Sequence, residues 1–169
     1  MTDWEDVYRN TFAELVRYLH RKVWDADRAR DLAQEVFVRA LDSAPDTPEN
    51  PRAWLFRVAT NLARDEARTV VRRRKHLTLL KSEVDEPAPP DPLETLEREA
   101  RERAAREALE QLSERDREVL LLWDAGLSYT EIAAQTGLAV GAIGTTLARA
   151  RRRLVEAHTG LEAKHAARR

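Results

Sequence analysis

The stretch NPRAWLFRVATNLARDEARTVVRRRK, residues 50–75, is the basis for interpreting the rest of the chain. Asn50 is suited to cap a helix, and Pro51 suits the first helical position because its missing N–H needs no partner there. No further Pro or Gly interrupts the stretch. It therefore predicts one long helix. Its apolar residues recur at helical spacing and form one predicted buried face: Leu55, Val58, Ala59 and Leu62.

The opposite face of this helix is basic. It is predicted to carry Arg57, Thr60, Asn61, Arg64 and Arg68. Residues 52–75 hold eight Arg or Lys residues and two acidic residues, a net charge of +6 in a chain whose net charge is −1. Charge concentrated in this way favours a polyanionic partner. The alternative is an ordinary solvated face.

Two aromatic residues lie beside these cations. Trp54 and Phe56 flank the apolar stripe at the start of the helix. Single-stranded nucleic acid is bound by such combinations, because bases stack on rings while guanidinium groups follow the phosphates. A core position for Trp54 is equally consistent with the pattern.

Composition narrows the class of protein. The chain has 169 residues, 43% hydrophobic and 35% charged, with 5 Gly, which favours helices over sheets. Cys is absent, and the four His residues lie far apart or near the end, so no metal site and no cofactor is predicted. No apolar run approaches the roughly 18 residues of a membrane span, and the first residues do not resemble a signal peptide. A cytoplasmic protein without membrane insertion is expected.

The first domain is predicted to contain two more helices. Thr2 and Glu5 fit a capping box for a helix that ends near Val23, and Asp25 or Asp27 begins the next. The apolar residues of this second helix follow a repeat of three and four: Ala29, Leu32, Ala33, Val36, Phe37, Ala40 and Leu41. Its polar residues are predicted to face outward. Three such helices must bury their apolar faces against one another.

The second domain is predicted to contain a helix-turn-helix. Ser113 caps a helix that ends at Gly126, Ser128 and Glu131 form a capping box, and Gly137 supplies a turn before a helix from about Val140 past Leu154. Residues spaced as internal contacts are Ile132, Ala133, Leu138, Ile143 and Leu147. The last helix carries Arg149, Arg151, Arg152 and Arg153, which suit phosphate better than base edges.

These patterns predict an all-α fold of two small helical domains, an N-terminal bundle of three or four helices and a C-terminal four-helix domain. The expected boundaries are 1–75 for the first domain, 76–93 for an acidic Pro-rich linker, 94–157 for the second domain and 158–169 for a tail. The linker carries four prolines: Pro87, Pro89, Pro90 and Pro92. The sequence does not establish whether the tail is ordered.

With these motifs in place, the chain resembles the extracytoplasmic-function (ECF) group of the bacterial sigma-70 family of RNA polymerase sigma factors. DLAQEVFVRAL (31–41) resembles the core-binding helix of that family, and PRAWLFRVATNLARDEAR (51–68) its promoter-melting and minus-ten segment. LSYTEIAAQTGLAVGAIGTTLARARRRL (127–154) resembles its minus-thirty-five reader. Many members carry Lys or Arg with Ser where this chain has Gly144, Thr145 and Thr146, so the promoter sequence does not follow from the resemblance.

The resemblance implies a non-enzymatic promoter-specificity subunit and assigns roles to residues. The clamp helices of the largest polymerase subunit would bind Asp31, Gln34, Glu35 and Arg39. The opened strand at the minus-ten element would contact Trp54, Phe56, Arg57, Asn61, Arg64, Arg68, Arg72 and Arg73, with a flipped base received by residues 43–50. The minus-thirty-five element would contact Ala142, Thr145, Thr146, Arg149, Arg151, Arg152 and Arg153. The flap of the second-largest subunit, promoter DNA and an anti-sigma factor are the further partners implied.

Two other functions compete with this interpretation of the sequence. A stand-alone helix-turn-helix regulator would use the first domain to sense an effector or to dimerise, and the basic helix at 51–75 has no purpose in that arrangement. An enzyme acting on nucleic acid would need grouped carboxylates, a Gly-rich phosphate loop or a nucleophile with a base, and the sequence contains no such pattern.

Overall fold

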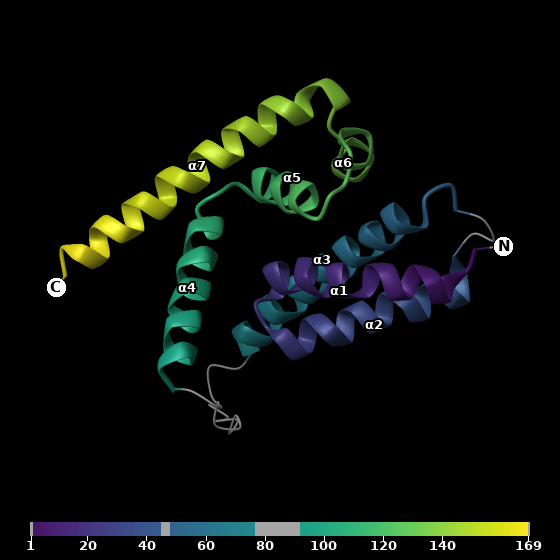
Figure 1. Ribbon diagram of the computed structural model, residues 1–169, viewed down its shortest axis with the longest axis horizontal. Helices are drawn as coiled ribbons and strands as arrows, with labels where there is room; N and C mark the ends of the chain where they lie inside the picture. The colour runs from purple at the N-terminus through teal and green to yellow at the C-terminus, as the bar shows by residue number, and fades with distance from the viewer. Residues whose placement is uncertain (1, 45–47, 77–91, 169) are drawn as a thin grey trace. The chain divides into compact units, whose positions relative to one another are not determined.

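The computed structural model describes residues 2–44, 48–76 and 92–168, with backbone only for 72–76. Within these ranges it contains seven α-helices and no strand (Figure 1). The chain divides into two compact units, Met1–Leu80 and Lys81–Arg169. The first unit holds α1 (Trp4–Val23), α2 (Ala26–Ser43) and α3 (Pro51–His76). The second holds α4 (Pro92–Glu110), α5 (Glu114–Asp124), α6 (Tyr129–Thr136) and α7 (Val140–Ala166). The predicted all-α class with two helical domains is confirmed.

Short polar residues begin the helices of the first unit. The Asp3 side chain accepts hydrogen bonds from the backbone N–H groups of Glu5 and Asp6, so Asp3 rather than the predicted Thr2 caps α1. Asp25 caps α2. Asn50 caps α3 as predicted, because its Oδ1 accepts from the Ala53 N–H at 3.0 Å.

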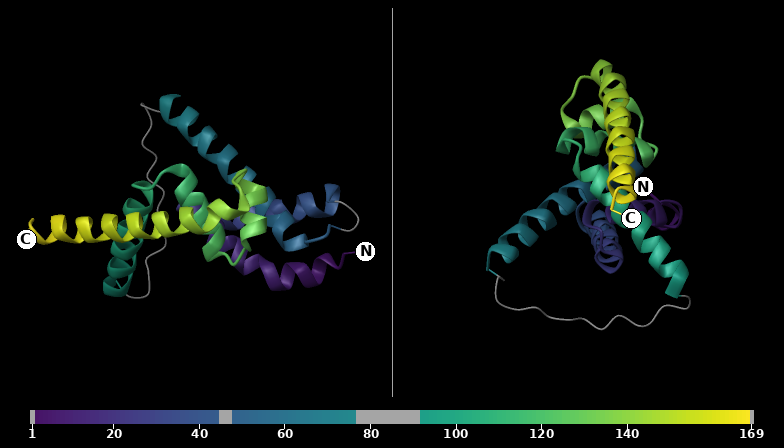
Figure 2. Two further views of the ribbon diagram at one scale, coloured as in Figure 1. Left: turned by 90° about the horizontal axis from the view of Figure 1, so that it is seen from above. Right: turned by 90° about the vertical axis from the view of Figure 1, so that its left-hand side faces the viewer.

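The first unit is a three-helix bundle in which each helix packs against the other two (Figures 1 and 2). Its core is formed by residues from all three helices: Leu15, Leu19, Ala29, Leu32, Val36, Leu55, Phe56, Ala59 and Leu62. Leu41 was predicted to belong to this core but is 70% exposed. The helical repeat alone does not show which of its apolar positions α1 and α3 cover.

A buried hydrogen-bond chain sets the orientation of α3 in the bundle. The Thr60 hydroxyl donates to the Phe56 carbonyl at 2.8 Å and lies 2.8 Å from the Tyr18 hydroxyl. Thr60 was predicted on the exposed basic face, but it is buried. The Phe56 carbonyl and the Tyr18 hydroxyl both satisfy the buried Thr60 hydroxyl, which matters because a buried hydroxyl without a partner is costly.

Two ion pairs tie α3 to its neighbours. Arg28 on α2 contacts both carboxylate oxygens of Glu66 on α3, at 2.7 and 2.8 Å. Arg52 on α3 donates from Nε and Nη2 to Glu14 Oε2 on α1, at 3.1 and 3.0 Å. The Arg28–Glu66 pair is bidentate, with two parallel hydrogen bonds to two oxygens, and this geometry adds directional specificity to the packing of α2 against α3. Arg52 is therefore occupied within the bundle.

The second unit contains the predicted helix-turn-helix, α6 followed by α7. Ser128 and Glu131 form the capping box of α6, and Gly137 ends it with φ +72°, a conformation that Gly adopts without a Cβ penalty. The core contains Val119, Leu122, Leu127, Ile132, Ile143 and Leu147. Trp123, near the end of α5, is 38% exposed.

The helices of the second unit extend further than predicted. Figure 2 shows α7 as one continuous rod, and it runs from Val140 to Ala166, so most of the expected tail at 158–169 is helical. α4 begins at Pro92, within the range expected for the linker. The rest of the linker, including Pro87, Pro89 and Pro90, lies outside the described residues. None of the described helices has the length and hydropathy needed to cross a membrane.

Phe56→Ala should lower the free energy of unfolding of the first unit by about 3–5 kcal/mol, because it empties a fully buried site. Arg57→Ala, at the adjacent exposed position, should change it by less than about 0.5 kcal/mol. Urea denaturation followed by far-UV circular dichroism measures both. Equal stabilities for the two variants would contradict the core position of Phe56.

Candidate nucleic-acid and polymerase interfaces

The exposed side of α3 presents a polar stripe. Arg57, Asn61, Arg64 and Arg68 are spaced by three or four residues, which places them on one side of the helix. Arg57, Asn61 and Arg68 are exposed and Arg64 is half-buried. Arg68 lies 3.5 Å from Asp65. This ion pair is exposed to solvent and therefore weak, so it does little to prevent Arg68 from contacting a ligand. The structure thus brings together four of the predicted single-strand contacts.

The two aromatic residues predicted beside this stripe have different environments. Trp54 is half-buried, and its ring centroid lies 6.1 Å from that of Trp4 on α1. Phe56 is 0% exposed and packs edge-on against Tyr18, with centroids 5.2 Å apart. Phe56 is therefore a core residue, and its predicted contact with DNA is wrong. Its position on the helix turns it inward, between Leu55 and Ala59.

Two other parts of the predicted minus-ten site are not described. The structure does not describe the side chains of Arg72 and Arg73. Residues 45–47 of the predicted base-receiving loop also lie outside the described residues. Their roles stay predictions.

The outer face of α2 carries the predicted polymerase-binding residues. Asp31, Gln34 and Arg39 are exposed, and Arg39 donates to the half-buried Glu35 at 2.7 Å. Val38 lies seven residues after Asp31, hence on the same face, and is 55% exposed. Leu41 extends the apolar surface by one turn. An apolar centre among polar residues is typical of protein interfaces. Sequence reasoning did not identify Val38 as part of this surface. The signal was present, because Val38 falls outside the apolar repeat of α2 and such a position indicates exposure.

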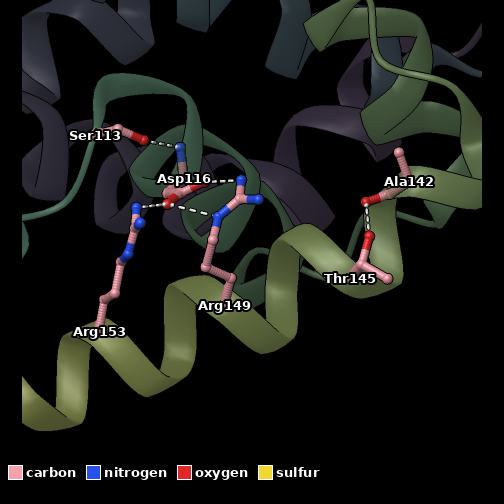
Figure 3. Close-up of polar contacts among 6 residues, drawn as sticks. All are labelled: Ser113, Asp116, Ala142, Thr145, Arg149 and Arg153. Atoms are coloured by element: carbon pink, nitrogen blue, oxygen red, sulfur yellow. Dashed lines mark hydrogen bonds and ion pairs between the residues drawn. The ribbon is translucent and has the colours of Figure 1, made fainter.

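The predicted reading helix, α7, exposes only part of its predicted contact set. Thr145, Arg151 and Arg152 are exposed, and Ala142 is half-buried. The Thr145 hydroxyl donates to the Ala142 carbonyl at 3.0 Å (Figure 3). Thr146 is 5% exposed and faces the unit's core, so its predicted DNA contact is wrong. Consecutive helical residues such as Gly144, Thr145 and Thr146 point to different sides of the helix, so they cannot all contact one partner.

Arg149 and Arg153 converge on one buried carboxylate. Figure 3 shows both side chains reaching from α7 to Asp116 on α5. Arg149 donates from Nη2 to Oδ1 at 2.6 Å and from Nε to Oδ2 at 3.2 Å, and Arg153 donates from Nη1 to Oδ2 at 2.9 Å. The Asp116 side chain is 1% exposed. Both arginines were predicted to contact phosphate, and sequence reasoning did not connect them to Asp116.

These contacts shift the ionisation of Asp116. The hydrogen bond from Arg149 lowers the pKa of the Asp116 carboxyl below its ordinary value, against the opposing effect of burial, and the charges of Arg149 and Arg153 lower it further. The same hydrogen bond raises the pKa of Arg149. Asp116 is therefore a carboxylate at neutral pH.

An aromatic pair borders the reading helix. The rings of Trp123 and Tyr129 lie 5.2 Å apart, and the Arg151 guanidinium carbon lies 5.8 Å from the Trp123 ring centroid. A Cβ placed on Gly144 would lie 3.6 Å from the Tyr129 ring. This is an ordinary van der Waals distance, so the Tyr129 ring lies beside α7 at position 144 and a small side chain there would fit. Among the described residues, no group of three His, Cys, Asp or Glu is arranged to hold a metal ion.

Comparison with known proteins identifies both units. Residues 6–74 match the family described as Sigma-70 region 2, and residues 102–154 match Sigma-70, region 4. The chain is 31% identical over 155 residues to the RNA polymerase sigma factor YlaC of Bacillus subtilis, covering 87% of each chain. It belongs to the ECF group of the sigma-70 family.

Two further comparisons agree with this membership. The ECF RNA polymerase sigma factor SigE of Mycolicibacterium smegmatis is 31% identical over 160 residues, which cover 91% of this chain and 61% of SigE. The solved structure of the sigma factor RpoE in complex with the anti-sigma factor NepR from Bartonella quintana superposes with a TM-score of 0.68 at 26% identity. That match covers 93% of this chain and 97% of RpoE. Membership in the sigma factors favours an initiation factor over a stand-alone regulator.

Asp116→Asn should destabilise the second unit by about 1–3 kcal/mol at neutral pH, because it removes charge-assisted hydrogen bonds at a buried site. The folded-state pKa of Asp116 is lowered, so its contribution is complete above the unfolded pKa of about 3.9 and is lost as the pH falls through the folded value. The stability difference between the native chain and the variant should therefore shrink below about pH 4. Thermal unfolding across a pH series measures it, and a constant difference would contradict the ionised state.

Proposed function

We propose that this chain directs core RNA polymerase to specific promoters and begins DNA melting there. Its first unit would bind the polymerase and the non-template strand of the minus-ten element. Its second unit would bind duplex at the minus-thirty-five element. The observation that carries the proposal is the stripe of Arg57, Asn61, Arg64 and Arg68 on α3, within the segment that matches sigma region 2. The chain acts without chemistry of its own, in the cytoplasm, where bacterial polymerase works.

Melting by such a surface needs no other energy source. Opening duplex costs about 1.4 kcal/mol per base-pair step in lost stacking. A base captured on a ring or in a pocket returns roughly 1–3 kcal/mol, so each captured base offsets a step or so. Trp54 is the aromatic residue beside the stripe that stays accessible, and the arginines supply contacts to the phosphates of the opened strand. Recognition of the strand and opening of the duplex are thereby one process.

The polymerase contact is assigned to the outer face of α2. Its acidic and polar residues, Asp31, Gln34, Glu35 and Arg39, surround the exposed Val38. We expect the clamp helices of the largest subunit to cover this face and the flap of the second-largest subunit to bind the second unit. Burial of Val38 gives the apolar contribution that surface ion pairs alone do not provide.

The minus-thirty-five contact is assigned to the outer face of α7. Thr145 and Arg152 are seven residues apart, hence on one face, with Ala142 and Arg151 beside them. Arg149 and Arg153 are left out of this set because Asp116 holds both. Few strong hydrogen-bonding groups face outward at the start of the helix, which favours phosphate contacts and DNA shape as the basis of recognition.

An anti-sigma factor is proposed as a further partner. The Bartonella quintana sigma factor was solved with one, and this chain resembles it over nearly its full length. Such a partner would cover the α2 and α7 faces until a signal releases them. Its recovery together with the chain from the native cell is the direct test.

Asn61→Ala and Arg64→Ala should each reduce permanganate-reactive thymines at a dependent promoter by about 10-fold, equivalent to one lost base contact of about 1.4 kcal/mol. Affinity for core polymerase should not change, because neither residue lies on α2. Arg17→Ala, an exposed arginine on α1, is the matched control and should leave reactivity unchanged. Loss of core binding in either α3 variant would show that α3 has been misassigned.

Val38→Asp should weaken binding to core polymerase by at least about 10-fold, because it places an unpaired charge at the centre of the interface. Val71→Asp introduces the same change at a valine of α3 that is 57% exposed, in the same unit but outside the α2 face, and should have no effect on that affinity. The double substitution Asp31→Arg with Glu35→Arg should abolish association. Normal holoenzyme assembly by the Val38 variant, measured by size-exclusion chromatography, would rule out this face.

A further inference from the structure

The four arginines at positions 149–153 of α7 fall into two pairs with different partners. Arg149 and Arg153, one turn apart, are bound by Asp116 at 2.6 and 2.9 Å. Arg152 lies 4.0 Å from the exposed Glu156, and Arg151 lies beside the Trp123 ring. The side chains of the first pair are 41% and 49% exposed, but their guanidinium groups are bound to a carboxylate of the same unit, whereas the second pair makes no contact with a buried carboxylate.

The geometry of the first pair bears on DNA binding. Arg149 uses its Nε and Nη2 groups for Asp116, and this is the edge with which a guanidinium takes an anion in a bidentate manner. A phosphate that approached Arg149 along that edge would have to displace the carboxylate. Because Asp116 is 1% exposed, solvent ions screen its attraction for the two arginines weakly.

We propose that Asp116 is a positioning residue that restrains DNA binding by α7. It holds Arg149 and Arg153 away from DNA phosphates and thereby lowers the affinity of the chain for duplex of any sequence. This inference rests on the proposed binding of duplex DNA by the second unit. Its consequence is specificity, because a sigma factor with weak affinity for arbitrary duplex depends on the contacts that only a promoter and bound polymerase supply.

The distribution of charge agrees with this role. Residues 140–154, the N-terminal part of α7, carry four arginines and no acidic residue, a net charge of +4. Each phosphate contact made by a cation contributes about 0.9 to the slope of log affinity against log salt concentration. Asp116 engages two of these four arginines, Arg149 through its Nε and Nη2 groups and Arg153 through Nη1.

The test measures binding of the full chain to a short fluorescent duplex of scrambled sequence over a salt series. Asp116→Asn should steepen the slope by up to about 1.8, for two released arginines, and raise affinity roughly 10-fold or more near 0.1 M salt. Glu114→Gln removes the same charge from an exposed position of the same helix and should leave the slope unchanged. An unchanged slope for the Asp116 variant, or an equal change for both variants, would overturn the proposal.

A second pair of variants keeps the buried carboxylate and so does not depend on the folding of the Asp116 variant. Arg153→Gln leaves Asp116 bound by Arg149 and should not alter the slope. Arg152→Gln, at the neighbouring exposed position, should reduce its magnitude by about 0.9. Equal reductions by the two variants would overturn the restraint, since Arg153 would then contact phosphate as Arg152 does. Circular dichroism verifies the fold of every variant.

The outcome is separable from that of the proposed function. Transcription with core polymerase tests whether the chain selects start sites, whereas the salt series uses the chain alone on arbitrary duplex. Tighter binding by the Asp116 variant without promoter-dependent start sites would support the restraint and reject the sigma activity. Start sites that depend on the chain, together with an unchanged salt slope, would reject the restraint only.

Discussion

The burial of one face of α3 is the constraint on which the first unit depends. Leu55, Phe56 and Ala59 are fully buried, and the buried hydrogen bonds among Tyr18, Thr60 and the Phe56 carbonyl fix the rotation of the helix about its axis. With this rotation, Arg57, Asn61 and Arg64 lie on the side of α3 opposite its buried face. The surface proposed to bind the opened strand is therefore a consequence of core packing, and a rotation of α3 by one residue would bury cations and expose Phe56.

The arginines of the chain serve two different purposes, and their partners distinguish them. Arg28, Arg52, Arg149 and Arg153 pair with carboxylates on neighbouring helices and join those helices. Arg57 and Arg152 are exposed on helix faces proposed for DNA. Sequence charge counts treat all of them alike. In residues 52–75, Arg52 is engaged with Glu14 and Glu66 with Arg28, so one cation and one carboxylate are taken up inside the bundle and the net charge of +6 on the other residues is unchanged.

Much of the fold was accessible from local signals. The capping residues Asn50 and Ser128, the turn at Gly137 and the apolar repeat of α2 act within a few residues of the chain, and each predicted its element correctly. Errors arose where the outcome depends on distant residues. Thr60 is buried, and Tyr18, 42 positions earlier, supplies one of its partners. Leu41 is 70% exposed although it continues the apolar repeat of α2, and α7 continues through Gly160 to Ala166.

The sequence by itself determined the helical class, the two-domain organisation, the helix-turn-helix and the resemblance to ECF sigma factors. Helix periodicity, caps and motif order can be recognised directly in the amino-acid sequence. Only the tertiary structure decided that Phe56 and Thr146 lie inside, that Val38 lies outside, and that Asp116 holds Arg149 and Arg153. The reason is physical: exposure and ion pairing are relations between residues on different helices, and they exist only after those helices have packed.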